Sequence, residues 1–527
     1  MSIPSFCFIL ILSLTFLYTL TGVVVRPSMY SDSGWGFLGS QSGQRAGAPF
    51  NSSMLPDVKD ISKDALGFST VWSPGQHFFP EFLASSGISL GLAIAIVTTV
   101  FSVLGLLGWF ALYRAFGFPV RSIMVALAII VCTRSFNAPF LIYNGGEVLL
   151  FGVAPYFVLI VWRIRNLRWR AIAPMIAGCF VMFFAKLSGI IFAVTTIGAA
   201  ALCGDKAWRD PDTLRKSAVA AIAIGIIGVI FYYAWYVQGW TPVRPALELN
   251  WGRLPTDIAF SISAACCASF SLSDLASYIL MNPGRAVVNS LNAVYFGFAP
   301  LAVGVFVLVW WRLRKDHGEY LRFVSLIAAA TVAVLLVTWV RGSIVGLEER
   351  HLRPVSLLFL VGIVHSFTGL PSRTARAIFA LVVAVASVYG LASFAQRTDF
   401  SLHRPLGNRG FRHLVASSSV LEFMHRIDVA ASDGQAPLVM VTTPEMGLEF
   451  RHLRVLSDHA DFDSLDELRA VTYRGRVPRL YVIMQKKFLT DGKADVILRS
   501  FVDYAIDDWK ETPLGDFICF SQIQPPS

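Results

Sequence analysis

Long apolar runs separated by short polar segments fill residues 1–396 of the chain. A helix needs about 20 apolar residues to cross a bilayer, and counting runs of this kind predicts about eleven membrane-spanning helices. The predicted spans are 5–25, 86–113, 120–136, 147–163, 171–186, 188–203, 217–237, 287–311, 323–340, 354–370 and 377–395. This pattern predicts an α-helical polytopic membrane protein.

The pattern changes after residue 396, where charged and apolar positions become mixed. Three short apolar stretches in this region are typical of buried strands, namely 437–443, 480–485 and 517–523. Two further stretches carry helical spacing, namely 463–471 and 494–509. The chain is therefore expected to divide into a transmembrane domain at 1–396 and a small soluble α/β domain at 397–527.

Composition and charge agree with a membrane protein. Of the 527 residues, 55% are hydrophobic and only 15% are charged, which excludes an ordinary soluble globular protein. A net charge of +10 would suggest nucleic-acid binding in a soluble protein. Here the Lys and Arg residues recur in short clusters between apolar runs, which is the pattern of cytoplasmic loops. No nucleic-acid partner is expected.

The segment 171–203 decides the predicted topology, because it reads either as one tilted helix or as a hairpin around Lys186. With the hairpin, the basic loops between spans all fall on one side, which the positive-inside rule favours. The amino terminus is then cytoplasmic and the C-terminal domain extracytoplasmic, and compact basic loops favour a bacterial inner membrane. The other outside segments would be 26–85, 137–146, 238–286 and 341–353.

Two carboxylates stand close to predicted helix ends. Asp32 follows the first span, where it either acts as a base at the water interface or begins a Ser/Gly-rich turn. Glu147 follows two glycines at the start of a span, where it either binds a ligand or only complements the helix dipole. Further along the first outside loop, WSPGQH supplies Trp72, Gln76 and His77 as candidate substrate contacts.

A dense group of charged residues lies at 341–353, between two apolar spans. Charged residues at membrane helix ends usually have a partner, so a functional role is favoured over a solvated loop. The candidates in this group are Arg341, Glu349, Arg350, His351 and Arg353.

Several of these motifs together resemble those of the GT-C membrane glycosyltransferases, which include the protein O-mannosyltransferase and aminoarabinose transferase-like superfamily. The resemblance rests on YSDSGWGFL at 30–38, WSPGQ at 72–76, YNGGEVLLF at 143–151, FFAKLSGIIF at 183–192 and EERHLRPVSLLFL at 348–360. The resemblance extends along the whole chain in the order of its motifs and membrane spans, although each motif is short. Two departures stand out, because Asp32 lacks an acidic neighbour and Ser73-Pro74-Gly75-Gln76 replaces the family's Lys/His-Pro-Pro element.

The resemblance implies inverting transfer of a sugar from a polyprenyl-phosphate donor, such as undecaprenyl phosphate, at the extracytoplasmic face. By position, Asp32 would be the general base and Glu147 would help to bind a divalent ion such as Mg²⁺ or Mn²⁺. The donor phosphate would be held by Lys186, Arg341, Arg350 and Arg353. The acceptor could be a glycan, a lipid or a protein.

Two other functions remain open at this point. One is a transporter or flippase for a lipid-linked solute, although the spans carry few charges and no inverted repeat is found. The other is an O-antigen ligase-like protein, although such proteins place their Arg and His residues in one large loop between late helices.

Overall fold

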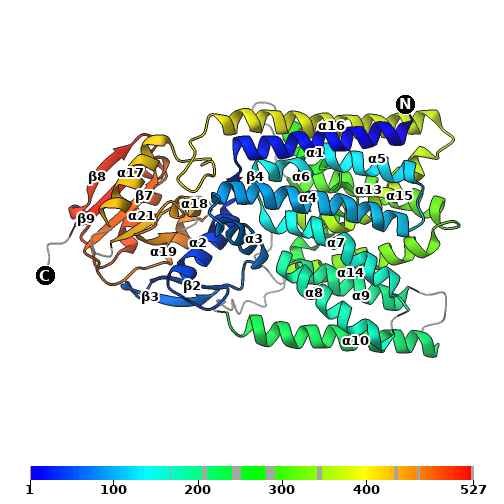
Figure 1. Cartoon of the computed structure of the whole chain (residues 1–527), viewed down its shortest axis with the longest axis horizontal. Helices are drawn as coiled ribbons and strands as arrows, with labels where there is room; N and C mark the ends of the chain where they lie inside the picture. Colours follow the sequence, from blue (N-terminus) through cyan, green and yellow to red (C-terminus); the bar gives the residue numbers. More distant parts are fainter. Residues whose placement is uncertain are drawn as a thin grey trace.

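The structure is a computed structural model that describes residues 2–166, 168–203, 210–239, 251–280, 291–340, 347–431, 437–457, 460 and 463–523. A helical bundle forms most of the molecule, and a five-stranded sheet with its own helices lies at one end of it (Figure 1). Between the two lie the short helices α2 (Ser31–Arg45) and α3 (Gly75–Ala84) and a hairpin of strands β2 (Ser52–Asp57) and β3 (Asp60–Phe68).

The bundle is built from long apolar helices, as the pattern of runs predicted. Seven described helices are long and apolar enough to cross a membrane, or up to nine if each of two bent pairs is one span. The helices of the bundle are α1 (Ile3–Val25), α4 (Leu90–Ala115), α5 (Val120–Cys132), α7 (Gly145–Arg163), α8 (Ile172–Ala185), α9 (Gly189–Leu202), α10 (Pro211–Phe231), α11 (Leu254–Cys267), α13 (Leu291–Leu313), α14 (Gly318–Val340), α15 (Arg353–Thr368) and α16 (Arg373–Leu402). The chain is an integral membrane protein, although the count of eleven spans is not confirmed.

The ambiguous segment 171–203 forms two helices. Helix α8 ends at Ala185, and α9 begins at Gly189 and packs against α8, so the predicted break around Lys186 is confirmed. A Cβ on Gly189 would lie 2.4 Å from the carbonyl oxygen of Met182. Only glycine therefore allows the chain to pass so close to the preceding helix.

The segment predicted as an open outside loop at 238–286 is different in the structure. Its described part forms α11 and α12 (Leu272–Leu280), which meet at an angle of 115°, and α11 packs against α13 and α15. The loop prediction was wrong because serines within this apolar helix make its sequence resemble a polar loop. Ser261 and Ser263 are buried and donate hydrogen bonds to backbone carbonyls one turn back, which satisfies their hydroxyl groups inside the bundle.

Of the two interpretations of Asp32, the Ser/Gly-rich turn is not what the structure has, because this stretch forms the helix α2 (Ser31–Arg45). Its glycines allow close approach of neighbouring segments. A Cβ on Gly43 would lie 1.9 Å from the carbonyl oxygen of Ser52, at the start of strand β2 (Ser52–Asp57). Strand β3 (Asp60–Phe68) completes the hairpin, and α3 spans Gly75–Ala84.

The C-terminal region contains the three predicted strands and two more. The sheet order is β6-β5-β7-β9-β8, with β5 parallel to both neighbours and β9 antiparallel to both of its own. Its elements are α17 (Ser418–Ala430), β5 (Leu438–Val441), α18 (Pro444–Gly447), β6 (Arg454–Ser457), α19 (Leu465–Arg469), β7 (Arg479–Gln485), α20 (Lys487–Thr490), α21 (Lys493–Ser500), β8 (Lys510–Leu514) and β9 (Phe517–Ile523).

One hydrophobic core joins this sheet to the membrane region. Val439 and Ile483 of the sheet belong to the same buried cluster as Phe37 and Leu38 of α2 and Leu90 at the start of α4. Phe37 and Leu38 are completely buried. Burial of apolar surface on this scale fixes α2 between the sheet and the bundle.

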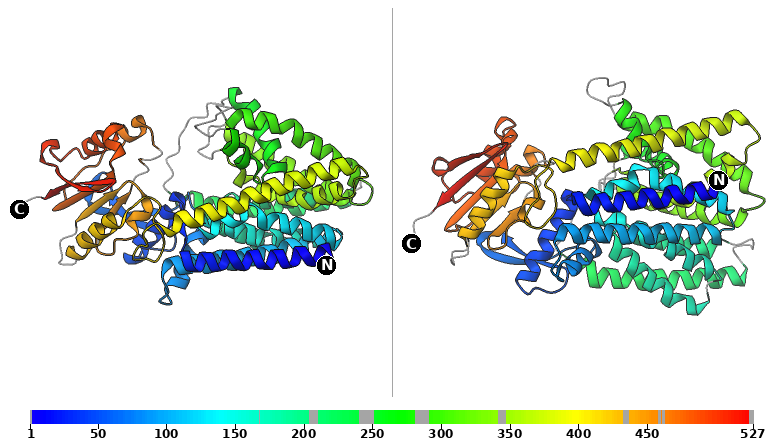
Figure 2. Two further views of the ribbon diagram at one scale, coloured as in Figure 1. Left: turned by 90° about the horizontal axis from the view of Figure 1, so that it is seen from above. Right: turned by 45° about the horizontal axis from the view of Figure 1, so that its top comes forward.

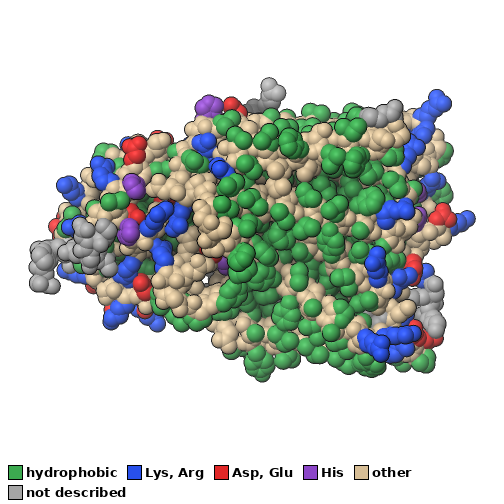
Figure 3. Space-filling model, viewed as in Figure 1, with side chains coloured by type: hydrophobic (Ala, Val, Ile, Leu, Met, Phe, Trp, Pro, Cys, Tyr) green, Lys and Arg blue, Asp and Glu red, His purple; other side chains and the backbone are tan. Residues whose placement is uncertain are grey.

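Charged side chains gather at the two ends of the molecule. The N-terminus lies at the end far from the sheet, and α16 runs along the bundle from that end toward the sheet (Figures 1 and 2). Apolar side chains cover the middle of the visible surface, whereas Lys and Arg gather at the far end and over the sheet region (Figure 3). An ion pair between Arg165 and Glu319 and a hydrogen bond from Arg312 to the carbonyl of Gly369 join the loops of the far end.

Candidate active site

Two short parallel strands set the position of the candidate site. Strand β1 (Ser28–Met29) pairs with β4 (Ile142–Tyr143), and the backbone N–H of Tyr30 donates to the carbonyl of Tyr143. Helix α2 begins directly after β1 and α7 directly after β4, so this pairing brings the two helix N-termini together. Asp32 lies in the first turn of α2 and Glu147 in the first turn of α7, where the helix dipole favours a negative charge.

Arg350 lies between these carboxylates and links them. Its Nη2 is 3.4 Å from Oδ2 of Asp32, and its Nε is 3.6 Å from Oε1 of Glu147. Its Nε also lies 2.5 Å from Oε2 of Glu348. Arg350 belongs to a short 3-10 turn, Glu349–His351, which precedes α15. One guanidinium thus contacts three carboxylates that come from three separate segments of the chain.

Lys186 supplies a second cation at the break between α8 and α9. Its Nζ lies 2.5 Å from Oε1 of Glu147, and both side chains are about nine-tenths buried, with exposed fractions of 12% and 10%. A Cβ on Gly146 would lie 3.2 Å from Cγ of Lys186, and one on Gly145 would lie 2.6 Å from Cβ of Gln76. The two glycines before Glu147 therefore let the lysine and α3 approach the N-terminus of α7.

A cavity of about 720 Å³ opens on this charge network. Asp32, Glu147, Lys186, Arg350 and His351 line its polar end, together with Trp72 and Gln76. Its remaining wall is mostly apolar and comes from α9, α14 and the segments that precede α3 and α9, with Val71, Leu187, Ile190, Ile191 and Leu335. The cavity thus combines a charged end with an apolar wall built by membrane helices.

A second cavity, of about 910 Å³, shares Asp32, Asn144, Glu147, Glu348 and Arg350 with the first. Its other walls are more polar and include Arg134, Asp274, Glu349, Arg353 and Arg397. Asp32 and Arg350 therefore lie where two cavities of different character meet.

Two buried titratable groups of the 3-10 turn are neutral over much of the ordinary pH range. Burial lowers the pKa of His351 to about 3, and the charges of Lys186 and Arg350 lower it further. Burial raises the pKa of Glu349 to about 7, and the nearby Asp274 acts in the same direction. Arg350 between them keeps its charge, so the turn presents one cation and two groups that can hydrogen-bond without charge.

The candidate residues named from the sequence separate into three groups. Asp32, Trp72, Gln76, Glu147, Lys186, Arg350 and His351 line the first cavity, and Glu349 and Arg353 line the second. His77 packs against the ring of Phe37 and lines neither cavity; burial lowers its pKa to about 4. Arg341 lies outside the described residues.

The acidic side chains at this site lie against cationic side chains of the protein. Among the described residues, no group of three or more His, Cys, Asp or Glu side chains is arranged to hold a metal ion. The carboxylate of Glu147 already contacts the cations Lys186 and Arg350, and Asp32 contacts Arg350. Positive charge is therefore supplied here by side chains.

Several site residues were not named as candidates from the sequence. Glu348 was seen only as part of the charged group at 341–353, and Asn144 only as part of the motif before Glu147. Arg134, Arg397 and Asp274 come from three distant segments, and Arg134 pairs with Asp274 at 3.4 Å. The sequence offers one signal for such residues, namely a single charged residue within an apolar stretch. In a membrane segment, such a residue indicates a buried partner.

Comparison with known proteins gives structural but no sequence matches. No family model matches the chain, and no curated protein matches its sequence. The crystal structure of ArnT from Cupriavidus metallidurans in the apo state is similar over 99% of this chain and 98% of that chain, with TM-score 0.50 and 13% identity. The arabinofuranosyltransferase AftD from Mycobacteria is similar over 90% of this chain but 35% of that chain, with TM-score 0.51 and 14% identity.

Both similarities extend over nine-tenths or more of this chain. The form of ArnT bound to undecaprenyl phosphate aligns with TM-score 0.49 and 13% identity. The fold of this chain is the GT-C-like fold of membrane glycosyltransferases.

Proposed function

We propose that the protein is an inverting glycosyltransferase that transfers a sugar from a polyprenyl-phosphate donor to an acceptor hydroxyl. The observation that carries the proposal is the first cavity, in which three carboxylates and two cations lie at one end of a mostly apolar wall. A lipid-linked sugar phosphate has the same division between an apolar tail and an anionic head. The GT-C-like fold supports the same class of reaction.

The proposed step assigns a role to each charged group. Asp32 accepts the proton of the acceptor hydroxyl as its oxygen attacks the anomeric carbon of the sugar. The bond between that carbon and the phosphate oxygen breaks, and the polyprenyl phosphate leaves with the negative charge. Lys186 and Arg350 stabilise this charge, since their charge-assisted hydrogen bonds to phosphate oxygens strengthen as the charge develops. Attack opposite the leaving group inverts the configuration.

The two cavities suggest where each substrate binds. The apolar wall of the first cavity suits the isoprenoid, and Trp72 and Gln76 at its polar end suit the sugar. The second cavity, with Arg353, Glu349 and Arg134, suits a polar acceptor. Asp32 faces both cavities, as a base that joins donor and acceptor must. The reaction would then take place at the end of the bundle that carries the sheet.

The proposed orientation follows from the charge at the other end. The N-terminus lies at the end away from the sheet (Figure 1), Lys and Arg side chains gather at that end too (Figure 3), and basic loops between membrane helices favour the cytoplasm. We infer that the sheet region and the site are extracytoplasmic, in a bacterial inner membrane. No step in the proposed mechanism passes through a metal ion. A role of Glu147 in holding one stays a prediction, which a titration of activity with Mg²⁺ and a chelator in wild type and Glu147→Gln tests.

The direct test is transfer of radiolabelled sugar by the purified protein from a panel of polyprenyl-phosphate donors, with Asp32→Asn as the variant. Asparagine has the same shape but cannot take a proton, so turnover is expected to fall about 10²–10⁴-fold. Asp466→Asn serves as a control, because it makes the same change at an exposed acid of α19 outside both cavities.

The outcomes separate the proposed function from its alternatives. Turnover that collapses in Asp32→Asn, with donor binding retained, supports the enzyme and its base together. Donor binding by wild type with no transfer to any acceptor contradicts the proposal and favours a transporter or flippase. Transfer only from a pyrophosphate-linked saccharide contradicts the monophosphate donor and favours an O-antigen ligase-like reaction.

A further inference from the structure

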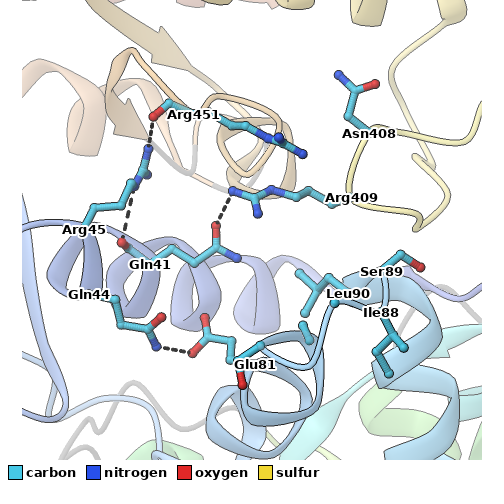
Figure 4. Close-up of a pocket in the computed structure, with 13 residues that line it drawn as sticks. Gln41, Gln44, Arg45, Glu81, Ile88, Ser89, Leu90, Asn408, Arg409 and Arg451 are labelled. Carbon is cyan, nitrogen blue, oxygen red and sulfur yellow. Dashed lines mark hydrogen bonds between the residues drawn. The ribbon is translucent and has the colours of Figure 1, made fainter.

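A third cavity, of about 520 Å³, lies away from the site, between the C-terminal half of α2, α3 and two loops of the sheet region (Figure 4). It shares no lining residue with either cavity at Asp32. Asp32 and Arg45 lie at opposite ends of α2, thirteen residues or about 20 Å apart at 1.5 Å per residue. The proposed transfer reaction does not use this cavity.

Three arginines from three segments converge on this cavity, namely Arg45, Arg409 and Arg451. Arg45 donates from Nη1 to the carbonyls of Phe450 and Arg451, and Arg409 donates from Nε to the carbonyl of Leu448 and from Nη2 to Oε1 of Gln41. Neutral backbone and amide oxygens therefore hold the guanidinium groups in place. Figure 4 shows the side chains of Arg409 and Arg451 extending toward each other.

These arginines lack a carboxylate at ion-pair distance within the described part of the chain. Two buried acids act on Arg45 and Arg409 from a distance but hydrogen-bond to other groups: Asp428 accepts the backbone N–H groups of Arg451, His452 and Leu453, and Glu449 accepts from Asn408 and His413. Three guanidinium groups close together repel one another, so their convergence is electrostatically unfavourable unless an anion lies among them.

The one acid that lines the cavity, Glu81, adds little negative charge. Burial raises its pKa to about 8, although Ser40 and Gln44 donate to its Oε2. This raised pKa favours the protonated carboxyl near neutral pH. Its buried Oε1 has no hydrogen-bond partner among the described residues, so a protonated carboxyl has one group available to a ligand.

We propose that this cavity binds a phosphate group through Arg45, Arg409 and Arg451, with Glu81 as a further hydrogen-bond partner. Arginine offers planar, paired donors that match phosphate oxygens, and three arginines balance a doubly charged phosphate. Leu90, the first residue of the membrane helix α4, also lines the cavity. The phosphate therefore belongs either to a soluble phosphorylated compound or to the headgroup of a membrane lipid.

Thermal unfolding of the purified full chain tests the proposal with two probes. One is inorganic phosphate, titrated at constant ionic strength against chloride. The other is a nanodisc that contains phosphatidic acid, compared with one of phosphatidylcholine alone. A ligand that binds only the folded state raises the Tm in proportion to its occupancy. Saturation by inorganic phosphate identifies a soluble source, and a response to phosphatidic acid alone identifies a lipid.

Single substitutions test whether phosphate binding depends on this cavity or on another part of the protein. Arg451→Gln is chosen because the exposed Arg451 side chain makes no hydrogen bond or ion pair within the described part of the chain, and the change is expected to weaken phosphate binding about tenfold or more. Arg409→Lys keeps the charge and loses the planar fork, so a smaller loss is expected. Arg499→Gln, which removes an exposed arginine of α21 paired with Asp495, is the matched control.

The response of Arg350→Gln distinguishes this site from the one proposed for the donor. Phosphate stabilisation that persists in Arg350→Gln and Arg499→Gln but is weakened in Arg451→Gln supports the proposal, whether or not the protein transfers sugar. Equal stabilisation of wild type, Arg451→Gln and Arg409→Lys overturns it. Absence of any response of wild type to both probes also overturns it.

Discussion

The Nη2 atom of Arg350 lies 3.4 Å from Oδ2 of Asp32, although 318 positions separate the two residues in the chain. The same guanidinium contacts Glu147 and Glu348. Arg350 therefore holds the candidate base while keeping its own charge at the meeting point of the two cavities. A substrate phosphate that enters would compete with these carboxylates for one cation.

Replacement of Arg350 should weaken donor binding more than folding. Arg350→Gln removes a charge-assisted contact worth about 1.5–3 kcal/mol, so donor affinity is expected to fall about 10–100-fold. Arg350→Lys keeps the charge without the fork and should give an intermediate loss. Binding of labelled polyprenyl phosphate to detergent-purified variants measures this. Arg165→Gln, at the opposite end of the bundle, is the matched charge control; unchanged affinity in a folded Arg350→Gln protein would count against a phosphate role.

The ion pair between Lys186 and Glu147 is buried, so loss of one partner alone should destabilise the folded protein. Lys186→Met leaves a carboxylate without its nearest cation, and such single losses destabilise by about 3–5 kcal/mol. The double variant Lys186→Met/Glu147→Gln removes both charges and should recover part of that loss. Denaturant or thermal unfolding of the two single variants and the double variant measures the coupling. Additive losses would show that the two charges do not depend on each other.

Much of the bundle was predictable because membrane spans are long and require apolar side chains. The breaks were harder to predict. The break at Lys186 was found because one charge interrupts a long apolar run, and the distribution of basic loops required it. The bent pair α11 and α12 was missed because serines that bond to their own helix look like a polar loop in the sequence.

The candidate site was predictable in its residue types but not in its pairings. Asp32, Glu147, Lys186 and Arg350 each attracted notice as a charge beside an apolar run. Their convergence depends on the two-residue pairing of β1 with β4, which is too short to leave a pattern. The helix at Asp32 was missed because glycines that permit close packing resemble glycines that form turns.

His351 should not contribute to the pH dependence of activity above pH 5. Burial lowers its pKa to about 3, so the imidazole is neutral throughout that range. His351→Gln keeps a neutral hydrogen-bonding side chain, and the shape of the pH–rate profile between pH 5 and 8 should stay the same even where the rate falls. Profiles of wild type and variant, measured with saturating donor, make the comparison. If the pH–rate profile of wild type has an inflection near pH 6.5 that the variant lacks, the histidine titrates in the enzyme.

Glu81 should make the folded protein less stable as the pH rises. Its folded pKa of about 8 exceeds the unfolded value of 4.5, so between these values the folded state binds more protons than the unfolded state. The stabilisation is complete below pH 4.5 and is lost as the pH rises through 8, with a slope of at most about 1.4 kcal/mol per pH unit.

Glu81→Gln removes this titration and keeps a group that can accept from Ser40 and Gln44. The difference in free energy of unfolding between variant and wild type should therefore grow in favour of the variant from pH 5 to pH 8. Asp466→Asn, at an exposed acid of α19, is the control and should give a flat difference. A flat difference for Glu81→Gln as well would mean that the carboxyl is already ionised in the folded protein. The arginines of the third cavity would then be balanced by the chain itself and not by a bound phosphate.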